Sequence, residues 1–164
     1  MAHHHHNTAL VILSIVIAMF ASYTALDLAS SISLAKGKVR WLWLGAGSLA
    51  MGIGIWSMHF IGMLAMSMPG IPIAYDVPLL ILSIVVAVFA SALTLFLVSR
   101  NNTTVSTYIA GSLAMGAAIS GMHYIGIWSM RMPAMIVWTY SYVLASIVIA
   151  IVASYVALLL AFKL

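Results

Sequence analysis

Two histidines and a group of methionines are the residues best suited to chemistry in this sequence. Apart from a histidine run at residues 3–6, His59 and His123 are the only histidines, and both lie in long apolar stretches. An ionisable side chain inside a membrane span is costly and usually faces the bundle interior, which makes it a candidate functional site. Imidazole and thioether groups together favour copper. Magnesium and calcium prefer oxygen ligands, and without cysteine a structural zinc site lacks its usual thiolates.

The surroundings of both histidines follow one pattern. Residues 58–62 and 122–126 both read Met-His-aromatic-Ile-Gly. Residues three, four and seven positions apart share a helical face, and glycines on that face allow a neighbouring helix to approach closely. We therefore predict that both histidines point into a helix bundle. The predicted metal ligands are two imidazoles and five thioethers: His59, His123, Met58, Met63, Met66, Met122 and Met130.

Other interpretations of these residues are open at this point. Each histidine could hydrogen-bond a serine on another helix, with Ser57, Ser83, Ser91 and Ser120 as candidates. Methionine is also a common filler of apolar cores. Two histidines at equal depth could ligate one haem b from both sides, and a relay of methionines would indicate a copper-handling membrane protein. The repetition of the pattern favours a metal site over a structural role.

The composition indicates which elements must position these side chains. Of the 164 residues, 65% are hydrophobic and 5% are charged, whereas soluble domains carry about 25% charged residues. This excludes a soluble globular domain, a disordered chain and a nucleic-acid-binding domain. We expect an all-α integral membrane protein, a five-helix transmembrane bundle. Five apolar stretches reach the roughly 20 residues that a spanning helix needs: residues 8–34, 41–67, 78–99, 106–130 and 138–162.

The chain contains an internal repeat of two helices. Residues 10–28 align without gaps on residues 79–97 with 12 identities in 19 positions, and residues 46–66 align on residues 110–130 with 13 in 21. Residues 144–160 resemble the first helix a third time. Helical pairs that start on the same side are parallel repeats, related by an axis along the membrane normal. His59 and His123 should therefore lie at equal depth.

These observations predict the organisation and orientation of the chain. We interpret residues 1–7 as a purification tag and N-terminal tail. The rest comprises repeat one (8–67), repeat two (78–131) and half of a third repeat (138–162). Basic residues mark cytoplasmic loops, which places the N-terminus outside, the C-terminus inside and both histidines near the outer face. The basic residues that fall on the inner side are Lys36, Lys38, Arg40, Arg100 and Lys163.

Several of these segments resemble a known family. The motifs Met58-His59-Phe60 and Met122-His123-Tyr124, the segment ASYTALDL at residues 21–28 and the run AMGIGIWSMHFIGM at residues 50–63 are similar to the bacterial MHYT domain. The resemblance covers nearly the whole chain after the first few residues. Two features depart from the family pattern. The fourth motif position, normally threonine, is isoleucine at residues 61 and 125, and a third motif is missing.

The resemblance implies a multi-pass sensor module of the bacterial cytoplasmic (inner) membrane, formed by residues 8–164. It implies copper binding near the outer face, sensing of a diatomic gas (O2, CO or NO) or of redox state, and relay to a cytoplasmic output domain. Such output domains are diguanylate cyclases or phosphodiesterases of cyclic-di-GMP signalling. The expected partners are the lipid bilayer, the gas and that output domain, without nucleic acid, and a second copy could form a homodimer.

We expect no enzymatic activity in this chain itself. The sequence offers no nucleophile–base pair, no paired carboxylates and no phosphate-binding loop. Any enzymatic activity of a parent protein would reside in other domains.

Overall fold

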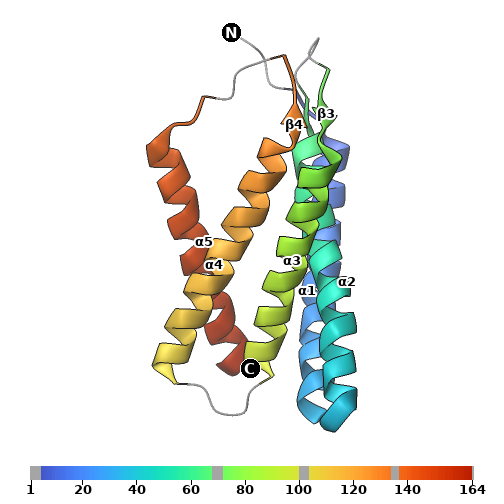
Figure 1. Ribbon diagram of the computed structural model, residues 1–164, viewed down its shortest axis with the longest axis vertical. Coiled ribbons are helices and arrows are strands. Elements are labelled where there is room, and N and C mark those ends of the chain that lie inside the picture. Colours follow the sequence, from blue (N-terminus) through green and yellow to red (C-terminus); the bar gives the residue numbers. More distant parts are fainter. Residues whose placement is uncertain (1–4, 68–71, 100–103, 134–136, 164) are drawn as a thin grey trace.

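The computed structural model describes residues 5–67, 72–99, 104–133 and 137–163, with the backbone alone for residues 5, 6, 26, 66, 67 and 161–163. All five of its helices are long and apolar enough to cross a membrane, which confirms the expected helical bundle (Figure 1). The helices are α1 (Thr8–Leu34), α2 (Gly37–Leu64), α3 (Val77–Val98), α4 (Val105–Trp128) and α5 (Tyr140–Lys163). The described strands are β1 (His5–His6), β2 (Met66–Ser67), β3 (Ala74–Tyr75) and β4 (Met130–Arg131).

The strands lie together at one end of the bundle, which we call the strand end (Figure 1). We call the opposite end, where α1 meets α2 and α3 precedes α4, the loop end. β1 pairs antiparallel with β2, and β3 pairs antiparallel with β4. Each pair joins the segment before one helix to the segment after the next helix, so each two-helix repeat is closed at the strand end.

These strand pairs correct two predicted helix ends. α2 ends at Leu64 and α4 ends at Trp128, so Met66 and Met130 belong to β2 and β4 rather than to the helices. The physical reason is backbone hydrogen bonding to segments that are distant in sequence, which helical periodicity does not reveal. At the other end of α2, the helix begins at Gly37, four residues before the predicted start.

Side-chain caps fix where two of the helices begin. The Asn7 carbonyl oxygen accepts a hydrogen bond from the backbone N–H of Ala9 at the start of α1. The Asp76 carboxylate accepts one from the backbone N–H of Leu79 at the start of α3, where Pro78 occupies the first turn. Such caps satisfy backbone donors that have no partner inside the helix, and proline fits the first turn because it lacks that donor.

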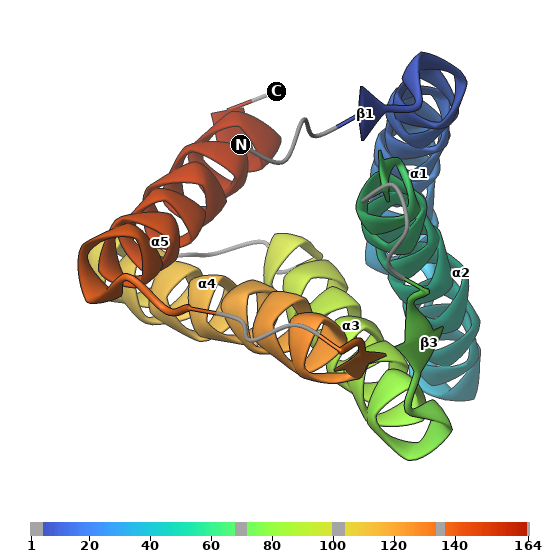
Figure 2. The ribbon, with the colours of Figure 1, turned by 90° about the horizontal axis from the view of Figure 1, so that it is seen from above.

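The helices follow one another around an open ring. Each packs against the next along the chain, and α1 and α5 stand at the two ends of the row (Figure 2). The two repeats make equivalent contacts. A Cβ added at Gly52 would lie 2.5 Å from the Cα of Val88 in α3, and one at Gly116 would lie 2.7 Å from the Cα of Ile151 in α5. Only glycine permits such close backbone approach, so the sequence repeat is also a repeat in space.

Small side chains occupy much of the interior. Ser83 and Ser91 of α3 are fully buried, together with a few aliphatic side chains such as Leu95. Large apolar side chains such as Met19 and Phe20 face outward and are about two-thirds exposed, at 68% and 70%. Close packing through small residues, with large apolar residues on the outside, is typical of helices that pack within lipid.

Candidate metal centre

The structure brings the two predicted histidines into direct contact. Nε2 of His59 in α2 lies 3.3 Å from Nδ1 of His123 in α4. The ring centroids are 4.8 Å apart, and the rings meet edge to face at 64°. Both side chains are half-buried. The histidines therefore point into the bundle, as their glycine-flanked positions predict, and there they contact each other.

Gly126 of α4 lies against this contact. A Cβ added at this position of α4 would lie 3.6 Å from Nε2 of His59 and 3.7 Å from Cε of Met63. The methyl end of Met63 therefore lies near the imidazole of His59, and the Met63 side chain is buried. Of the predicted thioether ligands, Met63 is the one whose contacts place it at the histidines.

The other predicted thioethers lie in different surroundings. Met122 is buried, and Met58 lines an internal cavity. Met130, in β4, lines a shallow hollow at the strand end with Pro72 and Pro133. The side chain of Met66 lies outside the described residues.

The donor set can be compared with what a metal ion needs. Two nitrogens that bind one metal at about 2.0–2.1 Å and a tetrahedral angle stand roughly 3.3–3.4 Å apart. The separation of 3.3 Å between Nε2 and Nδ1 suits this arrangement as well as an imidazole–imidazole hydrogen bond. Within the described residues, no group of three or more histidine or carboxylate side chains gathers to hold a metal. A metal at this pair would therefore need a thioether or another donor to complete its coordination.

Serines near the histidines take other hydrogen-bond partners. The indole Nε1 of Trp56 in α2 donates to Oγ of Ser83 at 2.8 Å. The phenol of Tyr124 in α4 shares a short hydrogen bond with Ser146 of α5. Ser91, another serine considered for the histidines, donates to the carbonyl of Ala87 in its own helix.

Ser83 of α3 and Ser146 of α5 occupy equivalent positions, in the second repeat and in the half repeat that follows it, but sequence reasoning missed their role. The partner of Ser83 is a tryptophan of repeat one that precedes the motif histidine, and the partner of Ser146 is the motif tyrosine of repeat two. The signal was the repeated serine. Its partner differs between the repeats, so no single motif reveals it.

Aromatic side chains connect the histidine helices to the strand end. The Trp56 ring stacks on Phe60 with centroids 4.9 Å apart, and Phe60 contacts the Tyr75 ring in β3 at the same distance. In the second repeat the Tyr124 ring lies 5.6 Å from Trp138. The aromatic position that follows each histidine therefore packs toward the strand end.

An ion pair also connects two segments at the strand end. Arg131 in β4 forms a salt bridge with Asp76, which precedes α3. The hydrogen bonds from Arg131 and from the backbone of Leu79 hold the pKa of the Asp76 carboxyl below its usual value. Burial raises the pKa of the neighbouring Tyr75 phenol. The carboxylate thus caps α3 and binds β4 at the same time.

Comparison with known proteins identifies the family. Residues 52–111 and 116–164 match the MHYT family, described as the bacterial signalling protein N terminal repeat. No solved structure matches the chain.

The chain is 46% identical over 159 residues to the bifunctional diguanylate cyclase/cyclic di-GMP phosphodiesterase MucR of Pseudomonas aeruginosa, covering 97% of this chain and 23% of that protein. It is 42% identical over 159 residues to the signaling protein YkoW of Bacillus subtilis, covering 97% and 20%. It is 36% identical over 154 residues to the cyclic di-GMP phosphodiesterase NbdA of Pseudomonas aeruginosa, covering 93% and 19%. The chain therefore spans no more than 23% of the length of these relatives. Since the family model matches more than half of its residues, this chain belongs to the MHYT family of bacterial signalling proteins.

Proposed function

We propose that this chain is a sensory input module and that a copper ion held between α2 and α4 is its sensing centre. The observation that carries the proposal is the contact between His59 and His123 across two non-consecutive helices. The two histidines occupy equivalent positions of two repeats, and a metal shared by such a pair would link the repeats directly.

The ligands of this centre would be His59, His123 and the thioether of Met63. Two imidazoles and a thioether form a soft donor set that suits copper better than magnesium or calcium. Copper bound there would supply a redox-active position able to take up a diatomic gas such as O2, CO or NO. The protein contributes a half-buried setting in which His59 and Met63 approach α4 at Gly126.

The signal would arise from the spacing of the two histidines. A change in the distance between His59 and His123 moves α2 relative to α4, and α3 packs against both of these helices. A stimulus shifts such an equilibrium only by as much as its affinity differs between the two arrangements. Rearranged helix packing at the loop end would then reach α5, which packs on α4.

The proposed orientation places the strand end outside the cytoplasmic membrane of a bacterium. Lys36, Lys38 and Arg40 stand at the loop end, and basic residues favour the cytoplasmic side. The last turn of α5 also lies at the loop end (Figure 1). Relatives named as diguanylate cyclase and phosphodiesterase extend far beyond the matched part. A cytoplasmic output domain joined after α5 would therefore receive the signal.

Copper content measured by mass spectrometry tests the metal centre. The protein with alanine in place of the histidines at residues 3–6, which keeps the backbone pairing of β1, should bind copper in stoichiometric amount after loading with Cu(I). The double variant His59→Ala/His123→Ala should lose it, and Met63→Ala should weaken it. Met19→Ala is the matched control, because Met19 faces outward and is 68% exposed. Unchanged copper in the double variant would overturn the proposed centre.

An absorption spectrum of the same sample separates copper from haem b. A haem iron between two axial histidines needs the porphyrin plane between the imidazoles, whereas these imidazoles touch each other. We therefore expect no Soret band. A Soret band that disappears in the double variant would replace copper by haem b as the cofactor.

A further inference from the structure

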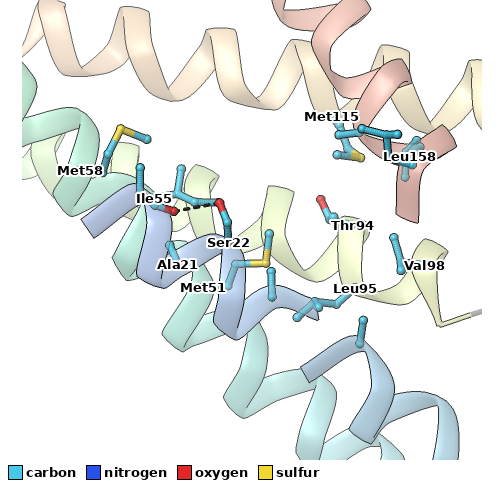
Figure 3. A pocket seen from close by; sticks show the side chains of 15 residues that line it. Ala21, Ser22, Met51, Ile55, Met58, Thr94, Leu95, Val98, Met115 and Leu158 are labelled. Carbon is cyan, nitrogen blue, oxygen red and sulfur yellow. Dashed lines mark hydrogen bonds between the residues drawn. The ribbon is translucent and has the colours of Figure 1, made fainter. Parts of the chain in front are cut away.

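A partly open cavity of about 480 Å³ lies inside the helix ring, and neither His59 nor His123 lines it (Figure 3). Side chains from all five helices line it. They include Ala18, Ala21, Ala25 and Ala29 of α1, Met51 and Met58 of α2, Thr94 and Val98 of α3, Met115 of α4, and Leu158 and Leu160 of α5. Cavities of this volume are typical of sites for small organic ligands.

The residues of α1 that line the cavity follow the axis of this helix. On α1 its wall runs from Ala18 to Ala29, a rise of about 16 Å at 1.5 Å per residue. The hydrocarbon of one leaflet is about 15 Å thick, half of the bilayer core. The cavity thus covers roughly the hydrocarbon depth of the leaflet at the loop end.

The lining offers no free hydrogen-bond donor. Its polar side chains are Ser22 and Thr94. The Ser22 hydroxyl donates to the carbonyl of Ala18 (Figure 3), and the Thr94 hydroxyl donates to the carbonyl of Ala90. The three methionine side chains are unbranched and adapt to the shape of an apolar guest. The lining therefore suits a hydrocarbon chain and gives no donor to the ring of a quinone or to a sugar.

The cavity is bordered by the two ends of the helix row. α1 and α5 both line it, and the helices pack in chain order, which leaves α1 and α5 apart from one another (Figure 2). A chain from the surrounding lipid can enter between them. α1 ends at Leu34, five residues past Ala29. The head group of an inserted lipid would therefore stand near Lys36 and Lys38, which are exposed.

We propose that the cavity binds one acyl chain of an anionic phospholipid from the leaflet at the loop end. Its length matches one leaflet, its lining matches a hydrocarbon, and the two lysines match a negative head group. Within the part of the chain that the structure describes, Lys36 and Lys38 form no ion pair. The bound lipid fills the interior of the ring and fixes the spacing of α1 and α5.

Lipid retained through detergent purification tests this proposal. Protein purified from membranes and washed extensively should keep phospholipid in stoichiometric amount, enriched in anionic head groups, when analysed by native mass spectrometry. Ala25→Phe and Ala157→Phe fill the cavity from α1 and from α5 and should each lose most of this lipid. Ala114→Phe is the matched control, because Ala114 of α4 is exposed and does not line the cavity, so retention should be unchanged.

The head-group variant and a folding control make the result decisive. Lys36→Gln/Lys38→Gln should abolish the anionic preference while some lipid is retained. Circular dichroism establishes that each variant is helical, and copper content is recorded in the same samples, so failure of lipid binding is distinguishable from failure of the metal centre. Folded wild-type protein without bound phospholipid would overturn the proposal. Lipid retention that is unchanged in both phenylalanine variants would also overturn it. So would a dimer in which the second copy covers the cavity in place of lipid.

Discussion

At the residue scale, α2 and α4 form hydrogen bonds to equivalent serines of α3 and α5 through different side chains. Ser83 accepts a hydrogen bond from Trp56, whereas the equivalent Ser146 bonds to Tyr124. Phe60 stands where Tyr124 stands in the other repeat, and it lacks the hydroxyl. The histidine positions were predictable because an ionisable group in a span must find a polar partner. That the partner is the other histidine rather than a serine depends on the curvature of the ring, which local sequence does not encode.

Gly126 provides the sharpest residue-scale prediction. A methyl group at this position meets His59 at an ordinary contact distance of 3.6 Å, so Gly126→Ala should keep bound copper. Gly126→Leu carries branched atoms into the space of His59 and Met63 and should lose it. The control is Gly45→Leu, because nothing lies within 4 Å of a Cβ at Gly45. Equal copper content in both leucine variants would contradict the packing described for this site.

Tyr124→Phe should destabilise the protein by removing the hydrogen bond to Ser146. Interhelical hydrogen bonds in membrane proteins contribute about 0.6 kcal/mol on average and up to about 1.7 kcal/mol. Unfolding in mixed detergent measures the loss, and Tyr23→Phe, at a side chain that is 74% exposed, is the control. Adding Ser146→Ala to Tyr124→Phe should cost little more, since the partner is already gone. Additive losses would assign the two residues separate roles.

At the element scale, the helices and their repeat were largely predictable, and their ends were not. The predicted limits of the first span agree with α1 at both ends, since Asn7 caps it and a turn at Gly37 follows it. The second and fourth spans were drawn too long because Met66 and Met130 continue the apolar pattern. Two-residue strands carry almost no sequence signal, and their partners lie far away in the chain.

The link between Asp76 and Arg131 predicts an acid-sensitive strand end. The pKa of Asp76 is lowered in the folded protein. The stabilisation from its ionised form is therefore complete above the usual pKa of an aspartate and is lost as the pH falls through the lowered value. The melting temperature should decrease over this acid range. Asp76→Asn keeps a side-chain cap for α3 but should remove this pH dependence.

Asp27→Asn serves as the control for that measurement. Asp27 and Asp76 are the only acidic residues of the chain, so replacing Asp27 should leave the dependence on Asp76 in place. Arg131→Gln should weaken the dependence because it removes the main cause of the lowered pKa. A pH profile that follows Asp27 instead would locate the acid sensitivity elsewhere in the bundle.

At the scale of the whole molecule, an odd number of spans sets the two ends of the chain on opposite sides. The structure places residue 5 at the strand end and the last turn of α5 at the loop end (Figure 1). The sequence predicted this arrangement from the number of spans and the basic residues. It did not predict the cavity, whose walls come from all five helices and exist only after the ring has formed.

Cysteine labelling tests the orientation of the whole molecule. The chain has no cysteine, so single substitutions give an unambiguous signal. In intact cells, a membrane-impermeant maleimide should label Ala74→Cys at the strand end. It should label Lys38→Cys at the loop end only after the membrane is permeabilised, and the unsubstituted chain is the background. The reverse pattern would invert the proposed orientation.

The differing partners of Ser83 and Ser146 also bear on how two copies of one ancestral unit could diverge. A hydroxyl oxygen has two lone pairs and can accept two hydrogen bonds. A chain with both a tryptophan at position 56 and a tyrosine at position 60 would satisfy the serine twice. From that intermediate, either donor could be lost by a single substitution without leaving the serine unpaired. Duplicated units could therefore diverge by single substitutions while the serine oxygen kept a hydrogen-bond partner from the neighbouring helix at every step.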